Sequence, residues 1–174
     1  MLKCHNLKTN EFQNSYYLKL VSELLLMETI SNTLSESIVT ALNQFDDLRF
    51  YFYRNVAHIL KNEDDAPHES SALFLAILLE LKHVESKVTF LNPESDYTGI
   101  NGDKTSQVSN PISFKKSFSD CWIAFLGQKM NQPTYIKILE VLHVKVIPKL
   151  VDPMKLMDFL VDAYNSGLIL MHCF

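Results

Sequence analysis

Glycine and arginine are both scarce in this chain. Only 4 of the 174 residues are glycine, which leaves no glycine-rich loop to cradle a phosphate group. The arginines are Arg49 and Arg54 alone, so the bidentate forks that read guanine or grip phosphate are nearly absent. Direct readout of RNA is therefore disfavoured, although a contact with RNA stays open.

Cysteine is also rare, and long apolar runs are absent. The three cysteines, Cys4, Cys121 and Cys173, share no short metal-binding spacing, so the sequence predicts no disulfide framework and no zinc site. No stretch reaches the roughly 18 apolar residues of a membrane span, and the N-terminus lacks the apolar run of a signal peptide. With 47% hydrophobic residues and a net charge of −4, the chain reads as a soluble intracellular globular protein.

What the sequence does have is helical periodicity in its N-terminal part. Apolar residues recur at steps of three and four over residues 15–34, which predicts one amphipathic helix. A second helix is expected to begin at Asp46 and Asp47, whose charges suit its positive end, and to be buried on two sides. The cluster from Phe50 to Tyr53 is interpreted as core rather than as a base-stacking platform. A third helix is predicted over residues 72–90, capped by Ser70 or Ser71.

Residues 92–112 combine proline and glycine with small polar residues and predict a flexible linker. Beyond it, Ser113 is expected to cap a helix that ends near Gly127. Pro133 marks the first turn of a helix that is apolar on both sides and is kinked or ended by Pro148, and Asp152 with Pro153 marks the start of a last helix, up to about residue 165.

The predicted fold class is therefore all-α, with stacked helical pairs that form a fragment of an armadillo- or HEAT-like solenoid. A plain helical bundle is the structural alternative. The expected division is an N-terminal helical region (1–91), a flexible linker (92–112) and an incomplete helical domain (113–174).

Candidate chemical groups are few. Glu80 and His83 have the spacing used in di-metal bundles, and Asp158 and Asp162 share a helix face, but both pairs are interpreted as solvated helix surface. His143 is interpreted as an interior histidine and Cys121 as a core residue without a catalytic base. The sequence thus predicts no enzyme, no catalytic or metal site and no cofactor.

Three segments carry a resemblance to a known family. They are Trp122-Ile-Ala-Phe-Leu126, Val146-Ile-Pro148-Lys-Leu150, and Asp158-Phe-Leu160 followed by Ala163-Tyr-Asn-Ser-Gly167. The chain resembles the CCAAT-binding-factor family of nucleolar proteins in these segments, which cover about its last third. In that family a glycine-rich turn leads into a long apolar helix, whereas here Gly167 is followed by Leu-Ile-Leu-Met-His-Cys-Phe174, so we expect only the early part of that domain.

The resemblance implies a non-enzymatic scaffold in small (40S) subunit assembly and ribosomal RNA processing, located in the nucleus and nucleolus. It implies protein partners, nucleolar protein 14 and pre-ribosomal particles, with no membrane and no small-molecule substrate. The alternative is a generic helical protein-protein adaptor without a ribosomal role. The residues expected to act as core or interface are Trp122, Phe125, Leu139, Leu142, Phe159, Leu160 and Tyr164.

Overall fold

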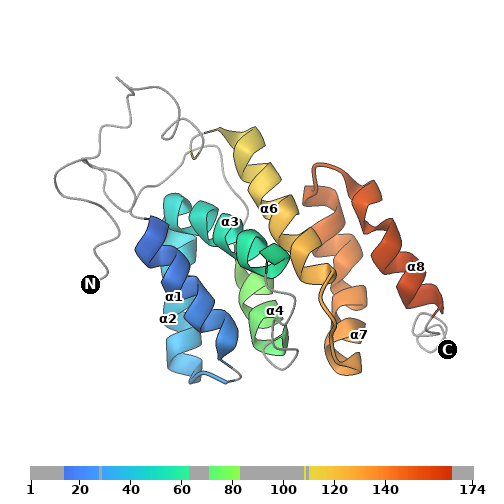
Figure 1. Ribbon diagram of the computed structural model, residues 1–174, viewed down its shortest axis with the longest axis horizontal. Coiled ribbons are helices and arrows are strands. Elements are labelled where there is room, and N and C mark those ends of the chain that lie inside the picture. The colour runs from blue at the N-terminus through green and yellow to red at the C-terminus, as the bar shows by residue number, and fades with distance from the viewer. Residues whose placement is uncertain (1–13, 28, 63–70, 83–107, 109, 166–174) are drawn as a thin grey trace.

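The computed structural model describes residues 14–27, 29–62, 71–82, 108 and 110–165, and every regular element within these ranges is helical. The expected all-α class is thereby confirmed. The α-helices are α1 (Asn14–Leu26), α2 (Asn32–Gln44), α3 (Asp46–Asn62), α4 (Ser71–Glu80), α6 (Pro111–Leu126), α7 (Gln132–Val141) and α8 (Met157–Asn165). They follow one another along the long axis of the molecule in roughly chain order, from α1 and α2 at one end to α8 at the other (Figure 1). Their assignment to armadillo- or HEAT-type pairs remains a prediction.

The first predicted helix is wrong in its extent, because residues 15–34 form parts of two helices. α1 ends at Leu26, and α2 begins at Asn32 after Ser31, whose Oγ accepts a hydrogen bond from the Leu34 N–H at 3.3 Å. This serine satisfies one of the amide groups that a helix start leaves without an intrahelical partner. α2 was not predicted as a helix of its own, although Ile38 and Leu42 recur at helical spacing, because the start of α2 was assigned to the preceding helix.

α3 begins at Asp46 as predicted and is buried on both sides. Two aspartates stand in its first turn, where the helix dipole favours negative charge. The core interpretation of its aromatic cluster is confirmed, since Phe50, Phe52 and Tyr53 are each 1% exposed. The Tyr17 hydroxyl of α1 donates to the Leu48 carbonyl at 3.1 Å and fixes α1 across α3.

α4 ends earlier than predicted. The helix was expected to reach residue 90, but it ends at Glu80, and Leu81 and Lys82 are not helical. Residues 83–90 lie outside the described residues. Phe74, Leu75, Ile77 and Leu78 of this helix are all buried, while Lys82 beyond its end is exposed.

The predicted linker falls mostly outside the described residues, so the division of the chain into two regions stays a prediction. Its end differs from the expectation, because α6 begins at Pro111 and not at Ser113. The cap is Asn110, whose Oδ1 accepts from the Ile112 N–H at 2.9 Å, and the helix ends at Gly127 as expected. Asparagine supplies the capping oxygen, and the proline after it has a fixed φ angle that suits the first residue of a helix.

α6 packs along α3 and joins the two predicted regions through aromatic rings. The Phe114 ring centroid lies 5.6 Å from that of Phe50 and 6.1 Å from that of Tyr53, and Phe118 lies 5.6 Å from Tyr53. At the far end of the pair, Gln128 Nε2 donates to the Leu60 carbonyl of the last turn of α3 at 3.0 Å. Each such ring pair contributes about 0.5–1.5 kcal/mol beyond the area that it buries.

α7 begins as predicted, with Asn131 Oδ1 accepting from the Thr134 N–H at 3.0 Å and Pro133 in the first turn. The helix then widens to a π-helix over Leu142–Val146 and tightens to a 3-10 turn over Ile147–Lys149. Pro148 explains the change, because a proline cannot donate to the carbonyl of residue 144 and its ring crowds that carbonyl. Val144, one of the apolar residues of the second side, is 63% exposed, so this side is not buried throughout.

α8 starts after the predicted Asp152-Pro153 signal. Asp152 Oδ1 accepts from the Met154 N–H at 3.1 Å, and a 3-10 turn over Pro153–Leu156 leads into the helix. The ring of Tyr135 stacks on that of Phe159 with centroids 4.7 Å apart, and its hydroxyl donates to the Phe159 carbonyl at 3.0 Å. α8 therefore rests on α7 at the end of the row.

We predict that Phe114→Ala destabilises the whole protein by about 3–5 kcal/mol, because it removes the ring that α3 and α6 share. Unfolding should be followed by far-ultraviolet circular dichroism and by the fluorescence of Trp122, the single tryptophan, which lies on α6. Both signals should report one coincident transition in the parent and the variant. Ile112→Ala, in the same turn but 75% exposed, is the matched control. Separate transitions for the two signals would contradict a shared core.

Candidate functional site

The residues predicted to act as core or interface fall into three groups in the structure. Trp122, Phe125 and Leu142 are each 2% exposed and Phe159 is 8% exposed, so these four lie in the core. Leu139 and Leu160 are partly buried and pack against it. Tyr164, by contrast, is 62% exposed and lies outside the core. A role of any of them in an interface stays a prediction.

The thiol of Cys121 is fully buried on the inner side of α6. Burial raises its pKa well above the usual range, and the charge of the neighbouring Asp120 adds to this effect. Burial raises the pKa of Tyr53 in the same way. Neither group is poised to ionise near neutral pH, because burial desolvates the ionised form, and at Tyr53 the nearby charge of Arg49 lowers the pKa by less than burial raises it. Cys121 is a core residue, as the sequence indicated.

The candidate metal ligands do not converge in the part of the chain that the structure describes. Glu80 is exposed and His83 lies outside the described residues, while Asp158 and Asp162 are both exposed. Within the described ranges no group of three or more histidine, cysteine or acidic side chains could hold a metal ion. The interpretation of His143 as an interior residue was wrong, because the π-helix buries Leu142 and Val146 and turns residues 143–145 outward.

A hollow of about 430 Å³ lies on the surface of α2 and is lined by Thr33, Glu36, Ser37, Thr40, Ala41 and Gln44. All six residues belong to one helix. Polar groups from a second element do not converge on it, as they do at sites that fix the orientation of a small ligand. The hollow is a stretch of open helix surface.

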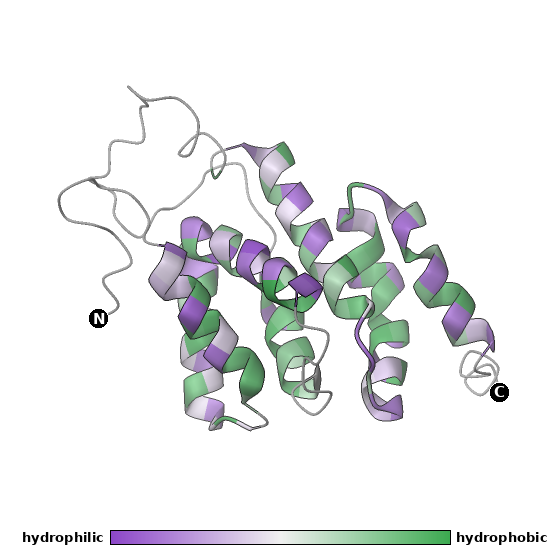
Figure 2. Cartoon of the chain, viewed as in Figure 1, coloured by the Kyte–Doolittle hydropathy of each residue, from purple (hydrophilic) through white to green (hydrophobic). Residues whose placement is uncertain are grey.

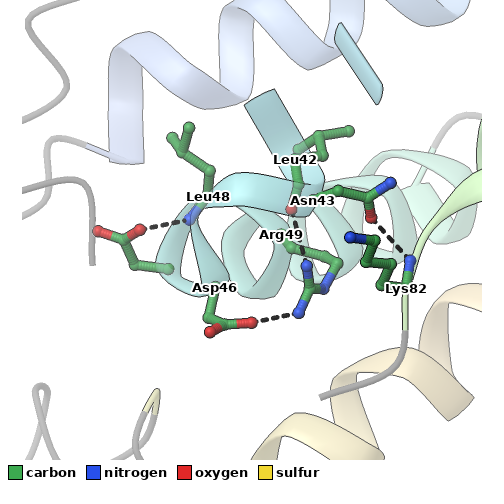
Figure 3. A network of polar contacts seen from close by, with 7 residues as sticks. Leu42, Asn43, Asp46, Leu48, Arg49 and Lys82 are labelled. Carbon is green, nitrogen blue, oxygen red and sulfur yellow. Dashed lines mark hydrogen bonds and ion pairs between the residues drawn. The ribbon is translucent and has the colours of Figure 1, made fainter. Parts of the chain in front are cut away.

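Buried polar groups gather where α2, α3 and the end of α4 meet (Figure 3). Arg49 is 2% exposed, pairs with the Asp46 carboxylate one turn before it, and donates through Nη1 to the Leu42 carbonyl at 2.9 Å. Its guanidinium carbon also lies 5.5 Å from the centroid of the Phe114 ring. A buried arginine needs such partners because an unpaired charge in the interior costs several kcal/mol.

Asn43 extends this polar cluster from α2 to α4. Its Nδ2 donates to the Glu80 carbonyl at 2.9 Å, and its Oδ1 accepts from the Lys82 backbone N–H at 2.7 Å. One side-chain amide thereby satisfies two backbone groups at the end of α4. Neither Asn43 nor Arg49 was predicted to have this role. The available signal was an arginine inside an apolar helix two residues after a pair of aspartates, and this signal does not reveal the other partners.

The polar side chains of this cluster join helices, since Arg49 links α3 to α2 and Asn43 links α2 to the end of α4. Among the described residues, no helix is long and apolar enough to cross a membrane. The class that fold and site define is therefore an all-α protein with one aromatic core and a row of helix faces toward solvent.

Comparison with known proteins places this helical chain among relatives of one kind. It is homologous, at modest identity, to proteins named nucleolar complex protein 4. Nucleolar complex protein 4 of Saccharomyces cerevisiae is 30% identical over 129 residues, which cover 70% of this chain and 21% of that protein. Nucleolar complex protein 4 homolog B of Xenopus laevis is 25% identical over 174 residues, covering 92% of this chain and 32% of that protein.

An uncharacterized protein of Schizosaccharomyces pombe is 29% identical over 158 residues, covering 89% of this chain and 33% of that protein. The chain thus spans a third or less of the length of these three relatives. No family model matches the chain, so its resemblance to the CCAAT-binding-factor family stays a prediction. No solved structure matches it either.

We predict that Arg49→Met destabilises the protein by about 3–5 kcal/mol, because the Asp46 carboxylate loses its buried partner. The double variant Asp46→Asn with Arg49→Met should lose less, since no charge is then left uncompensated. The control is Arg54→Met on the same helix, an exposed arginine whose guanidinium carbon lies 5.6 Å from the Phe50 ring centroid. Urea unfolding measures all three variants. Equal losses of unfolding free energy in Arg49→Met and Arg54→Met would show that the buried position of the Arg49–Asp46 pair does not matter for stability.

We also predict that Cys121 does not react with Ellman's reagent in the native protein. The measurement uses Cys4→Ser with Cys173→Ser, so that one thiol remains. At mildly alkaline pH the raised pKa keeps this thiol protonated, and burial excludes the reagent. Reaction should become complete in guanidinium chloride. Rapid reaction of the folded protein would instead indicate an accessible thiolate and would reopen the question of catalysis.

Proposed function

We propose that this protein is a non-enzymatic ribosome-biogenesis factor that acts in the nucleolus as a scaffold in small (40S) subunit assembly and ribosomal RNA processing. The observation that carries the proposal is homology to nucleolar complex protein 4. The match to the yeast protein covers 70% of this chain, and the match to a Xenopus protein covers 92% of it. Because the chain spans a third or less of these relatives, the proposal concerns the contribution of this helical segment.

The structure supports a scaffold role in two respects. The one described cysteine is buried, and the acidic and histidine side chains of the described residues gather no metal-binding group. At the same time, the row of helices presents several large apolar side chains to solvent, among them Ile112, Met154 and Tyr164. Exposed apolar side chains that gather in patches mark surfaces for contact with other macromolecules.

The partners that we propose are nucleolar protein 14 and pre-ribosomal particles, reached through protein contacts. The scarcity of arginine supports protein contacts over direct reading of RNA, because arginine is the side chain best suited to bases and phosphates. We propose that the buried members of the predicted set, Trp122 foremost, hold the contact surface in shape. The more exposed Tyr164 would belong to the surface itself.

The test is affinity purification of the tagged 174-residue chain from cells at moderate salt, with mass spectrometry of what accompanies it. We expect enrichment of small-subunit precursor factors with nucleolar protein 14, and nucleolar fluorescence of the tagged chain. A nuclease-treated sample is the matched control, and enrichment should persist in it if protein contacts carry the binding.

Two results would overturn the proposal. Recovery of cytosolic proteins without ribosomal factors would favour a generic helical adaptor. Recovery of chaperones alone would show that this chain does not act as a scaffold by itself.

A further inference from the structure

We draw no further inference here: the strongest candidate, the exposed apolar side of α8 and of the turn before it (Figure 2), carries none, because nothing in the structure shows what covers it and the exposed charges beside it, Lys155, Asp158 and Asp162, are of both signs.

Discussion

The packing of α6 along α3 is the contact on which the rest of the structure depends. Phe114 brings its ring to Phe50 and Tyr53, residues about sixty positions earlier in the chain, and so places two distant segments in one core. The same ring lies near the guanidinium group of Arg49. This ring adds to the partners that α3 and α2 already give the buried charge, and it links the polar cluster to the aromatic packing. α4 joins through Phe74, which contacts rings on both helices.

The sequence predicted those elements whose signal is local and strong. Asp152 before Pro153 supplies a cap and a preset first turn, and the structure begins its last helical segment there. α2 was not predicted, although Ile38, Val39 and Leu42 pack on the core at helical spacing, because the break at Ser31 between α1 and α2 was not recognised. The cap of α6 was predicted at Ser113, whereas the structure has it at Asn110. Several residues near a helix start can each accept a hydrogen bond from a backbone amide, so the sequence does not single out one of them.

The chemistry of the interior could be predicted only in part. Burial of Cys121 follows from its place on an apolar stripe, because that is a property of one helix. The role of Arg49 does not follow, because its partners come from a helix end and a ring elsewhere in the chain. His143 was placed inside because Leu142 and Val144 flank it. Apolar neighbours in the sequence do not decide which side of a helix a residue faces, and here residues 143–145 of the π-helix lie outward.

A row of helices distributes its apolar surface unequally between its middle and its ends. α3 lies within the row, and nearly every side chain on both of its sides is buried against a neighbour. α8 packs against a neighbour on one side, yet it has apolar residues on both. Its exposed apolar residues therefore lack the hydrophobic stabilisation that α3 gains by burial on both sides. The helices that bury most of their side chains, α3 foremost, give the row its stability, whereas the exposed apolar residues of α8 contribute little to it.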